Sequence, residues 1–381
     1  MFKYESLNAA VLPVLPKVLC SLCFLAVTAT ILPTGVAYAG PKTTEVKTPA
    51  ITKVEQVTAP APLPKFKLEL VTSGVDRPIQ FGSIAVKGSY SKTYVGSQSG
   101  AIYPLDTKKA AEPSVPAAEE ADPQGSAASA LKPVLDIKEK ILMPLEGGLL
   151  GFAFDPAFST NLYVYVHYTG KKQKALMNRI SRFKIETASA DENSETQEIL
   201  LDIPQENPAD LGGQIVFDDA NNLLVGIGDG GGELDPFGRG QSLSDLFGSI
   251  LRLDVSGTKA VAAADNPFSS DGDGRREIYA YGFRNPSTMF FDRISKQLYA
   301  GDAGVGYMQE LNLVVAKGNY GWSLRDGTEC RQLPFECKNN RQFKEPEFSY
   351  TKEKGVSIVA GCVYSMPKET DPLYQLNGAF I

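Results

Sequence analysis

The sequence predicts an all-β protein in which one strand-turn-strand unit is repeated, and a β-propeller explains that repeat best. Period-two alternation of apolar and polar residues dominates from residue 65 onward, and long helical patterns are scarce. Each copy of the unit ends its first strand in Phe-Asp, continues into a polar turn and begins its second strand with Leu. The Phe-Asp pairs start at Phe154, Phe217 and Phe291.

The three copies share a further feature, because each hairpin is followed by another segment with the alternation of a strand. The hairpins run over residues 152–165, 215–226 and 289–301, and the following strands over 179–185, 249–255 and 310–315. Units that recur with long loops between strands are typical of propeller blades. A β-sandwich with similar hairpins would give the same local pattern and remains the alternative fold.

Composition is that of an ordinary soluble protein and excludes one class of partner. Of 381 residues, 43% are hydrophobic and 22% are charged, which supplies enough apolar material for a core. The formal net charge of −6 comes without any Lys/Arg-rich run. Because nucleic-acid binding depends on a basic patch, we expect no nucleic-acid partner.

Residues 1–39 have the pattern of a secretory signal peptide. Lys3 and Lys17 precede an apolar run, which ends in the small-residue sequence Ala37-Tyr38-Ala39. The run is nearly long enough to span a bilayer, so an uncleaved anchor is the alternative. Cleavage would leave no stable membrane span and would export the mature chain to the periplasm or the exterior.

Two biased segments interrupt the globular part. Residues 40–64 are rich in Pro, Thr, Lys and Ala without aromatics, which is typical of a flexible linker. Residues 108–130 are rich in Ala, Pro and Glu and lie between strand-like segments, so we expect a low-complexity surface insertion. The predicted propeller domain therefore covers residues 65–381.

Three cysteines would remain after cleavage of the signal peptide. Cys330 and Cys337 flank a loop short enough to be closed by a disulfide in an oxidising compartment. A zinc site is the alternative, but no CxxC pair or neighbouring histidine supports it. Cys362 is left over, and we expect it to be a small hydrophobic side chain buried in a strand.

His167 is the single histidine of the chain and lies in an alternating strand, where we expect a structural role. A single histidine excludes multi-histidine metal sites and makes a Ser-His-Asp triad a poor explanation. General-base chemistry would therefore fall to carboxylates. Asp229, in the glycine-rich run Gly226–Gly232, is the residue of interest there, because glycines at a strand end let backbone pass close to a ligand.

Six motifs, in the same order along the chain, resemble those of the soluble quinoprotein glucose/sorbosone dehydrogenases. Aldose sugar dehydrogenases and the hedgehog-interacting-protein-like proteins share this domain. The resemblance extends from about residue 67 to the end of the chain. The motifs are Glu146–Phe158 (EGGLLGFAFDPAF), Gly212–Phe217 (GGQIVF), Gly226–Gly230 (GIGDG), Tyr281–Pro286 (YGFRNP), Gly301–Val305 (GDAGV) and Gly318–Trp322 (GNYGW).

The resemblance implies a six-bladed β-propeller, of which this sequence would hold four blades and part of a fifth. The segment Gly355–Tyr364 would begin the fifth blade, and family members continue through roughly one more. A propeller closes by joining its first and last blades. We therefore expect the chain to be a fragment, or its ring to be incomplete.

The family's enzymes bind pyrroloquinoline quinone (PQQ) with calcium in the central groove. The resemblance implies that a small sugar, an aldose, is oxidised at its C1 hydroxyl, that hydride passes to the quinone, and that an external acceptor takes the electrons. It implies that Arg284 and Asn285 line the cofactor, with Glu146 near it. The backbone carbonyls of Gly304 and Val305 would hold the calcium, as hard oxygen ligands do.

Two further metal positions follow from the same resemblance, since Glu310 and Tyr320 match residues that hold a structural calcium in some members. The catalytic position departs from the pattern: where the dehydrogenases carry their histidine, this chain has Asp210, and its carboxylate partner is Asp229. An ordinary Asp, with a pKa of about 3.9, is a weaker base than imidazole. Two close carboxylates can raise one pKa and restore some basicity.

Three functions remain open from the sequence. The first is a PQQ- and calcium-dependent sugar dehydrogenase with Asp210 and Asp229 as a weakened base pair. The second is a non-catalytic secreted propeller that binds a carbohydrate or a protein. The third is a hydrolase using the same two carboxylates as acid and base, which fits the carboxylates but not the quinoprotein motifs.

Overall fold

The computed structural model describes residues 9–13, 68–84, 92–105, 132–185, 196–268, 272–303, 308–331, 337, 342–355 and 357–362. Strand β1 (Ala9–Pro13) pairs antiparallel with β2 (Leu68–Ser73). Apart from β1, the predicted signal peptide at 1–39, the linker at 40–64 and the insertion at 108–130 lie outside the described residues.

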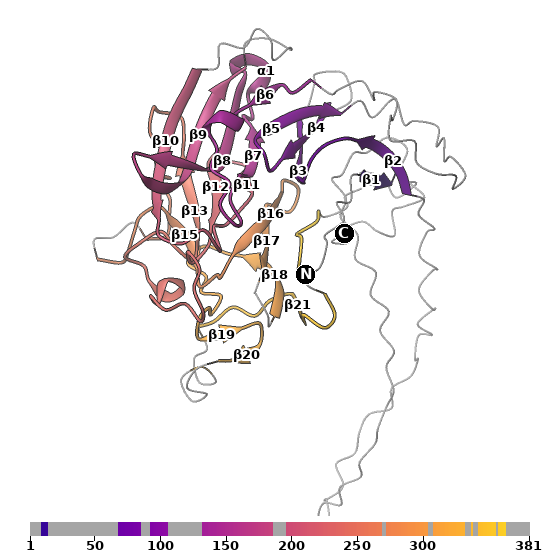
Figure 1. Ribbon diagram of the computed structural model, residues 1–381. Coiled ribbons are helices and arrows are strands. Elements are labelled where there is room, and N and C mark those ends of the chain that lie inside the picture. The colour runs from indigo at the N-terminus through magenta and orange to yellow at the C-terminus, as the bar shows by residue number, and fades with distance from the viewer. Residues whose placement is uncertain are drawn as a thin grey trace, which may run out of the picture.

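Four antiparallel sheets, the blades, follow one another in chain order around an arc (Figure 1). The first two blades contain β3 (Pro78–Ile84), β4 (Lys92–Ser97), β5 (Ala101–Leu105) and β6 (Leu135–Asp136), then β7 (Leu149–Phe154), β8 (Tyr163–Lys172), β9 (Ala175–Lys184) and β10 (Thr196–Gln205). The third contains β11 (Ile215–Phe217), β12 (Leu223–Ile227), β13 (Ser249–Asp254), β14 (Val261–Ala262) and β15 (Ile278–Tyr281). The fourth contains β16 (Pro286–Asp292), β17 (Gln297–Ala303), β18 (Met308–Val314) and β21 (Phe348–Thr351).

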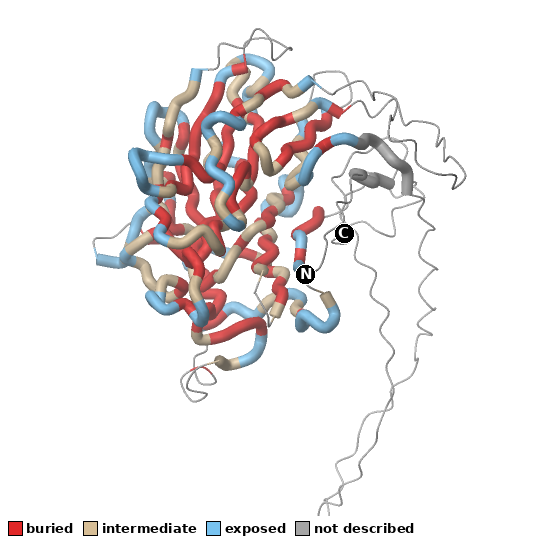
Figure 2. Tube along the Cα trace, viewed as in Figure 1, coloured by how far each residue is buried: buried red, intermediate tan, exposed pale blue. Residues whose placement is uncertain are grey.

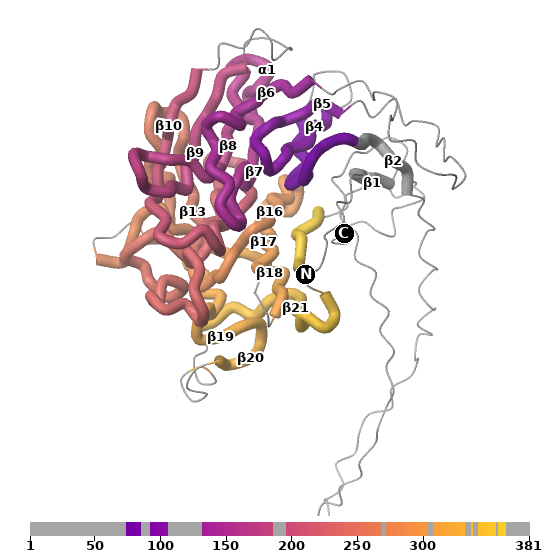
Figure 3. Tube along the Cα trace, viewed as in Figure 1, coloured from indigo at the N-terminus to yellow at the C-terminus, as the bar shows by residue number. Residues whose placement is uncertain are grey.

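The first strand of each blade lies innermost, since β3 packs on β7, β7 on β11, and β11 on β16. At one point, just before β11, the backbone of the third blade approaches β16 too closely for any side chain. A Cβ atom on Gly213, just before β11, would lie 1.9 Å from the carbonyl oxygen of Ser287 in β16. Glycine is therefore required at that position. The predicted β-propeller is confirmed, with four blades in the described residues, and Figure 3 traces the chain through them.

The repeated Phe-Asp pair has a local structural cause. Asp155, Asp218 and Asp292 each accept a hydrogen bond from the backbone amide two residues further on. This Asx-turn ends the first strand of the hairpin and directs the chain into the second. All three predicted hairpins are confirmed, as are the strands that follow them.

Aromatic side chains fill the space between neighbouring blades. The Phe152 ring of β7 is fully buried against the first blade, where a Cβ on Gly82 would lie 2.6 Å from the ring. Tyr165 and Phe217 join the second and third blades, with their ring centroids 5.1 Å apart. Burial of one such ring stabilises the fold by about 1.5–3 kcal/mol. Figure 2 shows that buried residues lie along the strands and that exposed residues lie mainly in loops.

The short helices lie outside the blades. Among the described residues, they include the α-helix α1 (Phe158–Asn161) in the β7–β8 turn and the 3₁₀ helices η1 (Lys138–Lys140) and η3 (Arg239–Gln241). No helix among the described residues is long and apolar enough to cross a membrane.

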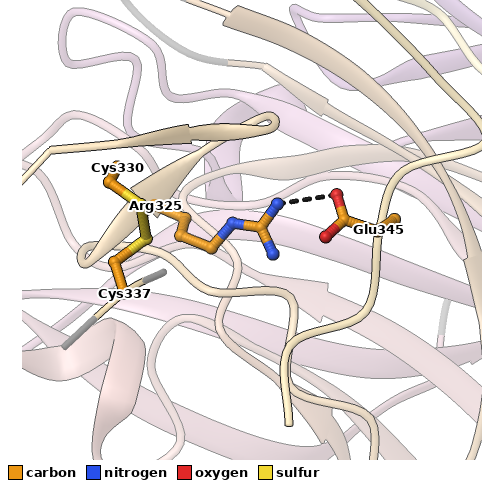
Figure 4. The surroundings of a disulfide bond; sticks show 4 residues. All are labelled: Arg325, Cys330, Cys337 and Glu345. Carbon is orange, nitrogen blue, oxygen red and sulfur yellow. Dashed lines mark hydrogen bonds and ion pairs between the residues drawn. A yellow bond between two sulfur atoms is a disulfide. The ribbon is translucent and has the colours of Figure 1, made fainter. Parts of the chain in front are cut away.

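The predicted disulfide between Cys330 and Cys337 is confirmed, with an S–S distance of 2.14 Å and Cα atoms 5.7 Å apart. It closes the end of a small hairpin formed by β19 (Arg325–Asp326) and β20 (Glu329–Cys330). Beside it, Arg325 Nη2 donates to Glu345 Oε2 at 2.6 Å (Figure 4). These two cysteines are therefore not zinc ligands.

One prediction near the end of the described chain is wrong, and it concerns Cys362. In the expected fifth-blade segment Gly355–Tyr364, residues 357–362 have no assigned strand and lie against the fourth blade, where the Ala360 amide donates to Thr288 Oγ1 of β16 at 2.7 Å. Cys362 is buried but is not a simple hydrophobic side chain, since it is disulfide-bonded. Its partner lies outside the described residues.

Candidate active site

Three predicted site residues converge where loops of the last three blades meet. Asp210 lies between β10 and β11, Asp229 follows β12, and Arg284 precedes β16. Backbone hydrogen bonds join their loops: the Asp229 amide donates to the Arg284 carbonyl at 2.8 Å, and the Gly230 amide to the Asp210 carbonyl at 3.2 Å. A tight turn makes this approach possible. Gly212 has φ +86°, and a Cβ there would lie 2.1 Å from the Gly226 carbonyl oxygen.

Asp210 is the most exceptional residue of the three. It is 3% exposed and has a φ of +48°, which non-glycine residues seldom adopt. Its Oδ2 accepts from Arg284 Nη2 at 3.3 Å, and its amide donates to Glu146 Oε2 at 2.9 Å. Its Oδ1 is buried and has no hydrogen-bond partner among the described residues. An unsatisfied buried oxygen is costly, and its presence points to a functional role.

Asp229, by contrast, is held through both carboxylate oxygens. Oδ1 accepts from the Gly231 amide at 2.8 Å, and Oδ2 accepts from the indole Nε1 of Trp322, also at 2.8 Å. The Arg284 guanidinium carbon lies 5.2 Å from the centroid of the same indole ring. Trp322 was not among the predicted site residues, although the last of the six motifs ends on it.

The two carboxyl groups are unusually basic for aspartates. Burial, opposed by Arg284 and reinforced by Glu146, raises the pKa of Asp210 to about 6. Burial, reinforced by the charge of Asp210, raises the pKa of Asp229 to about 7. The pair therefore gains and loses its protons near neutral pH, as groups that act as general bases do.

Asn285 and Arg284 are fixed from beneath by one side chain. Both of their backbone amides donate to the Asp302 carboxylate, at 2.6 Å and 2.9 Å respectively. The Asn285 side-chain oxygen accepts from the Gly212 amide at 2.8 Å, so it ties the Asp210 loop to the Arg284 loop. Asp302 was not predicted as a site residue. Its only sequence signal is its place in the Gly301–Val305 motif.

Two of the four predicted metal residues, Glu310 and Tyr320, lie in the described part of the chain. Glu310 is buried, accepts from the Gly327 amide and from Asn312, and burial raises its pKa to about 8. The Tyr320 hydroxyl donates to the Leu313 carbonyl at 2.6 Å. Gly304 and Val305 lie outside the described residues. Among those that are described, no group of three His, Cys, Asp or Glu residues is arranged to hold a metal.

His167 has a structural role, as the sequence predicts. It is fully buried in β8, and its Nδ1 lies 2.7 Å from the carbonyl oxygen of Gly213. Burial lowers the pKa of His167 to about 4, so the ring is neutral and Nδ1–H is the donor. Asn178 Nδ2 donates to the neighbouring Leu211 carbonyl at 2.6 Å. Two buried side chains of the second blade therefore anchor the loop that carries Asp210.

Comparison with solved structures agrees with this architecture. The PQQ-bound aldose sugar dehydrogenase of Streptomyces coelicolor superposes with a TM-score of 0.55 at 23% identity, over 74% of this chain and 70% of that one. A glucose dehydrogenase-like oxidoreductase from Thermus thermophilus gives 0.54 at 23% identity, over 73% and 71%. At these identities the likeness establishes the fold.

Sequence comparison establishes the family. A Synechocystis protein without an assigned activity is 31% identical over 194 residues, which are 49% of this chain and 45% of its own. Quinoprotein glucose dehydrogenase B of Acinetobacter calcoaceticus is 28% identical over 240 residues, which are 57% of this chain and 48% of that protein. Human hedgehog-interacting protein is 27% identical over 177 residues, which are 42% of this chain and 25% of that protein. The chain spans less than half the length of each of these relatives. Residues 123–370 match the Glucose / Sorbosone dehydrogenase family, and the chain belongs to that family.

Proposed function

We propose that this protein is a sugar dehydrogenase that oxidises the C1 hydroxyl of an aldose with PQQ as the hydride acceptor. The observation that carries the proposal is the free Oδ1 of Asp210, a buried acceptor on a carboxylate whose pKa is raised to about 6. It lies at the loops where the family's motifs converge. Membership of the Glucose / Sorbosone dehydrogenase family supports the reaction class.

Asp210 would take the hydroxyl proton of the sugar at Oδ1. A free aspartate is a poor base for this step, but burial brings the pKa of Asp210 to about 6, close to the ~6.5 of imidazole. The replacement of the family's histidine by Asp210 is therefore compatible with base catalysis. Asp229 assists, because its negative charge favours a proton on its neighbour.

The polar groups of the site suit PQQ. Arg284 Nε is buried and lacks a hydrogen-bond partner among the described residues, so it would be available to donate to an oxygen of the cofactor. Arg284 and Asn285 would hold PQQ, with Glu146 near it. When bound, PQQ with calcium supplies the electrophilic carbonyl that accepts hydride. The calcium ligands stay a prediction: the carbonyls of Gly304 and Val305, with Glu310 and Tyr320 for a structural ion.

Export to the periplasm or the exterior completes the proposal. The Cys330–Cys337 disulfide supports it, because such bonds persist in oxidising compartments. The protein would then meet its sugar outside the cytoplasm and pass the electrons to an external acceptor.

A non-catalytic binding propeller is the second candidate. The observation that favours it is the match to hedgehog-interacting proteins, together with Asp210 at the family's histidine position. This candidate predicts a sugar or protein ligand bound at the same face without turnover.

Reconstitution separates the two candidates. The purified chain would be incubated with calcium and PQQ and assayed for dye reduction with a panel of aldoses. We expect aldose-dependent reduction that is abolished when PQQ is omitted. PQQ uptake without turnover on any aldose would favour the binding propeller, and release of reducing ends from oligosaccharides without PQQ would indicate a hydrolase instead.

A further inference from the structure

We propose that Trp322 is a positioning residue: its indole N–H holds Asp229 as a carboxylate and so keeps the Asp210–Asp229 pair available as a base at neutral pH. Its consequence for catalysis rests on the proposed function, but the interaction itself does not. The two residues are 93 positions apart in the sequence, and their contact is created by the fold.

Burial makes this hydrogen bond influential. Asp229 is 1% exposed and Trp322 is 4% exposed, so water does not compete for either partner. Both burial and the nearby charge of Asp210 favour the protonated form of Asp229. The two donors that oppose them are the indole N–H and the Gly231 amide. A donor to a buried charged group stabilises it more strongly than a donor to a neutral one.

Contacts independent of Asp229 fix the indole in place. The Trp322 amide donates to the Gly282 carbonyl at 2.9 Å, and the Trp322 carbonyl accepts from Gln241 Nε2 at 2.6 Å. Gly240 leaves room for the ring, since a Cβ there would lie 2.7 Å from the indole Cδ1. The ring is therefore held ready to donate, whatever the charge of the carboxylate.

The hairpin of β19 and β20, which the disulfide closes, is followed by a residue that packs on the Trp322 ring. Arg331 follows Cys330 directly, and its guanidinium carbon lies 5.1 Å from the centroid of the Trp322 ring. Its Nη1 also donates to Asp326 at 3.4 Å. A cation over an indole face strengthens the packing of that ring.

Charged side chains from several loops surround the pair and would all contribute to its titration. Asp210 and Asp235 add negative charge near Asp229, while cationic groups lie over the aromatic rings beside it. In the described part of the chain, these charged groups are Glu146, Asp210, Asp235, Arg239, Arg284 and Arg331, with Glu206, Asp302 and Asp326 beside the arginines.

The first test exploits Trp322 as the only tryptophan in the chain. Growth on 5-fluorotryptophan labels this single position, and the full chain would give one ¹⁹F resonance. We expect that resonance to titrate between pH 5 and 9 with a midpoint of about 7, the pKa of Asp229. The titration should disappear in Asp229→Asn and persist in Asp254→Asn, which removes an equal charge at the end of β13.

The second test removes only the N–H. The benzothiophene analogue of tryptophan has sulfur in place of the indole N–H and keeps the size of the ring. Because Trp322 is the single tryptophan, incorporating the analogue changes this residue alone. We expect the pH at which the pair titrates to rise by about one unit, read from the pH dependence of the free energy of unfolding. In an active preparation, the acid limb of kcat/KM should move by the same amount.

The results that test the role of Trp322 differ from those that test the proposed dehydrogenase activity. A ¹⁹F resonance that does not move in the folded chain, or that titrates unchanged in Asp229→Asn, would overturn the role of Trp322. The same conclusion would follow if the pH dependence of the free energy of unfolding did not shift in the benzothiophene-substituted protein, once circular dichroism has shown that this protein is folded. Absence of aldose turnover, in contrast, would contradict only the proposed function.

Discussion

At the scale of single residues, the chemistry of this site depends on burial more than on residue type. Asp210 stands where the family has histidine, yet desolvation moves its pKa toward that of an imidazole. The same burial leaves its Oδ1 unsatisfied. A residue that is strained, buried and incompletely hydrogen-bonded lowers stability, and such costs are common where function requires them.

The first prediction concerns the proposed base. Asp210→Asn removes the proton acceptor but keeps the shape of the side chain, so dye reduction should fall by about 10²–10⁴-fold. Asp219→Asn is the matched control, because Asp219 is exposed and forms a surface ion pair with Lys296. Equal rates for the two variants would rule out Asp210 as the base. Asp210→His should retain activity if the imidazole occupies the same place.

The second prediction concerns pH and stability. The pKa of Asp210 in the folded state, about 6, lies above its unfolded value of 3.8. The folded protein therefore gains its full stabilisation from protonated Asp210 below pH 3.8, and this stabilisation is lost as the pH rises to about 6. Relative to the wild type, Asp210→Asn should therefore gain stability through this window, by up to about 3 kcal/mol. Urea denaturation of the cofactor-free proteins at pH 4, 6 and 8 measures it. A constant difference across these pH values would show that Asp210 has an ordinary pKa.

At the scale of elements, one sequence repeat serves two different structural roles. The Asp of each Phe-Asp pair forms the same Asx-turn, but Asp218 also accepts from Arg252 Nε at 2.7 Å in a nearly buried ion pair. Asp155, at the equivalent position in the second blade, has no ion-pair partner among the described residues. Local sequence predicts the turn, whereas the ion pair depends on the neighbouring strand β13.

The third prediction compares these two equivalent positions. Asp155→Ala should lower the free energy of unfolding by about 1 kcal/mol, the value of a turn-capping hydrogen bond. Asp218→Ala should cost about 3–5 kcal/mol, because it leaves the Arg252 charge buried without one of its partners. Chemical denaturation of both variants provides the comparison. Similar losses would mean that the ion pair contributes nothing beyond the turn.

The fourth prediction concerns the hairpin of β19 and β20. Replacing Cys330 and Cys337 together by serine should lower the free energy of unfolding by about 2–3 kcal/mol, as expected for a short closed loop. Because Arg331 lies over Trp322, the ¹⁹F resonance of that residue should shift as well. A stability loss with an unchanged resonance would separate the hairpin from the site.

At the scale of the whole molecule, sequence reasoning predicted what is local or periodic. The hairpins, the Phe-Asp turns and the disulfide all depend on residues close together in the chain. The contact of Trp322 with Asp229 and the support of Arg284 by Asp302 join distant segments, so no spacing revealed them. The family resemblance implied Asp210 and Asp229 as a base pair and Arg284 as a cofactor contact, and the structure brings the loops of these three residues together.

The same limit explains the error at Cys362. The apolar pattern around this residue predicts burial, and its side chain is 2% exposed. The disulfide of Cys362 is a covalent contact that the local pattern does not contain, so the expectation of a simple hydrophobic side chain was wrong.

Titration of the purified chain with PQQ in the presence of calcium, followed calorimetrically, tests the central claim most directly. We predict saturable binding of one PQQ per chain, weakened at least tenfold by Arg284→Gln, which removes the buried Nε donor. Arg293→Gln, in the exposed turn between β16 and β17, should bind as the wild type does. Absence of saturable binding, or equal binding by the two variants, would contradict a PQQ site at the centre of this propeller.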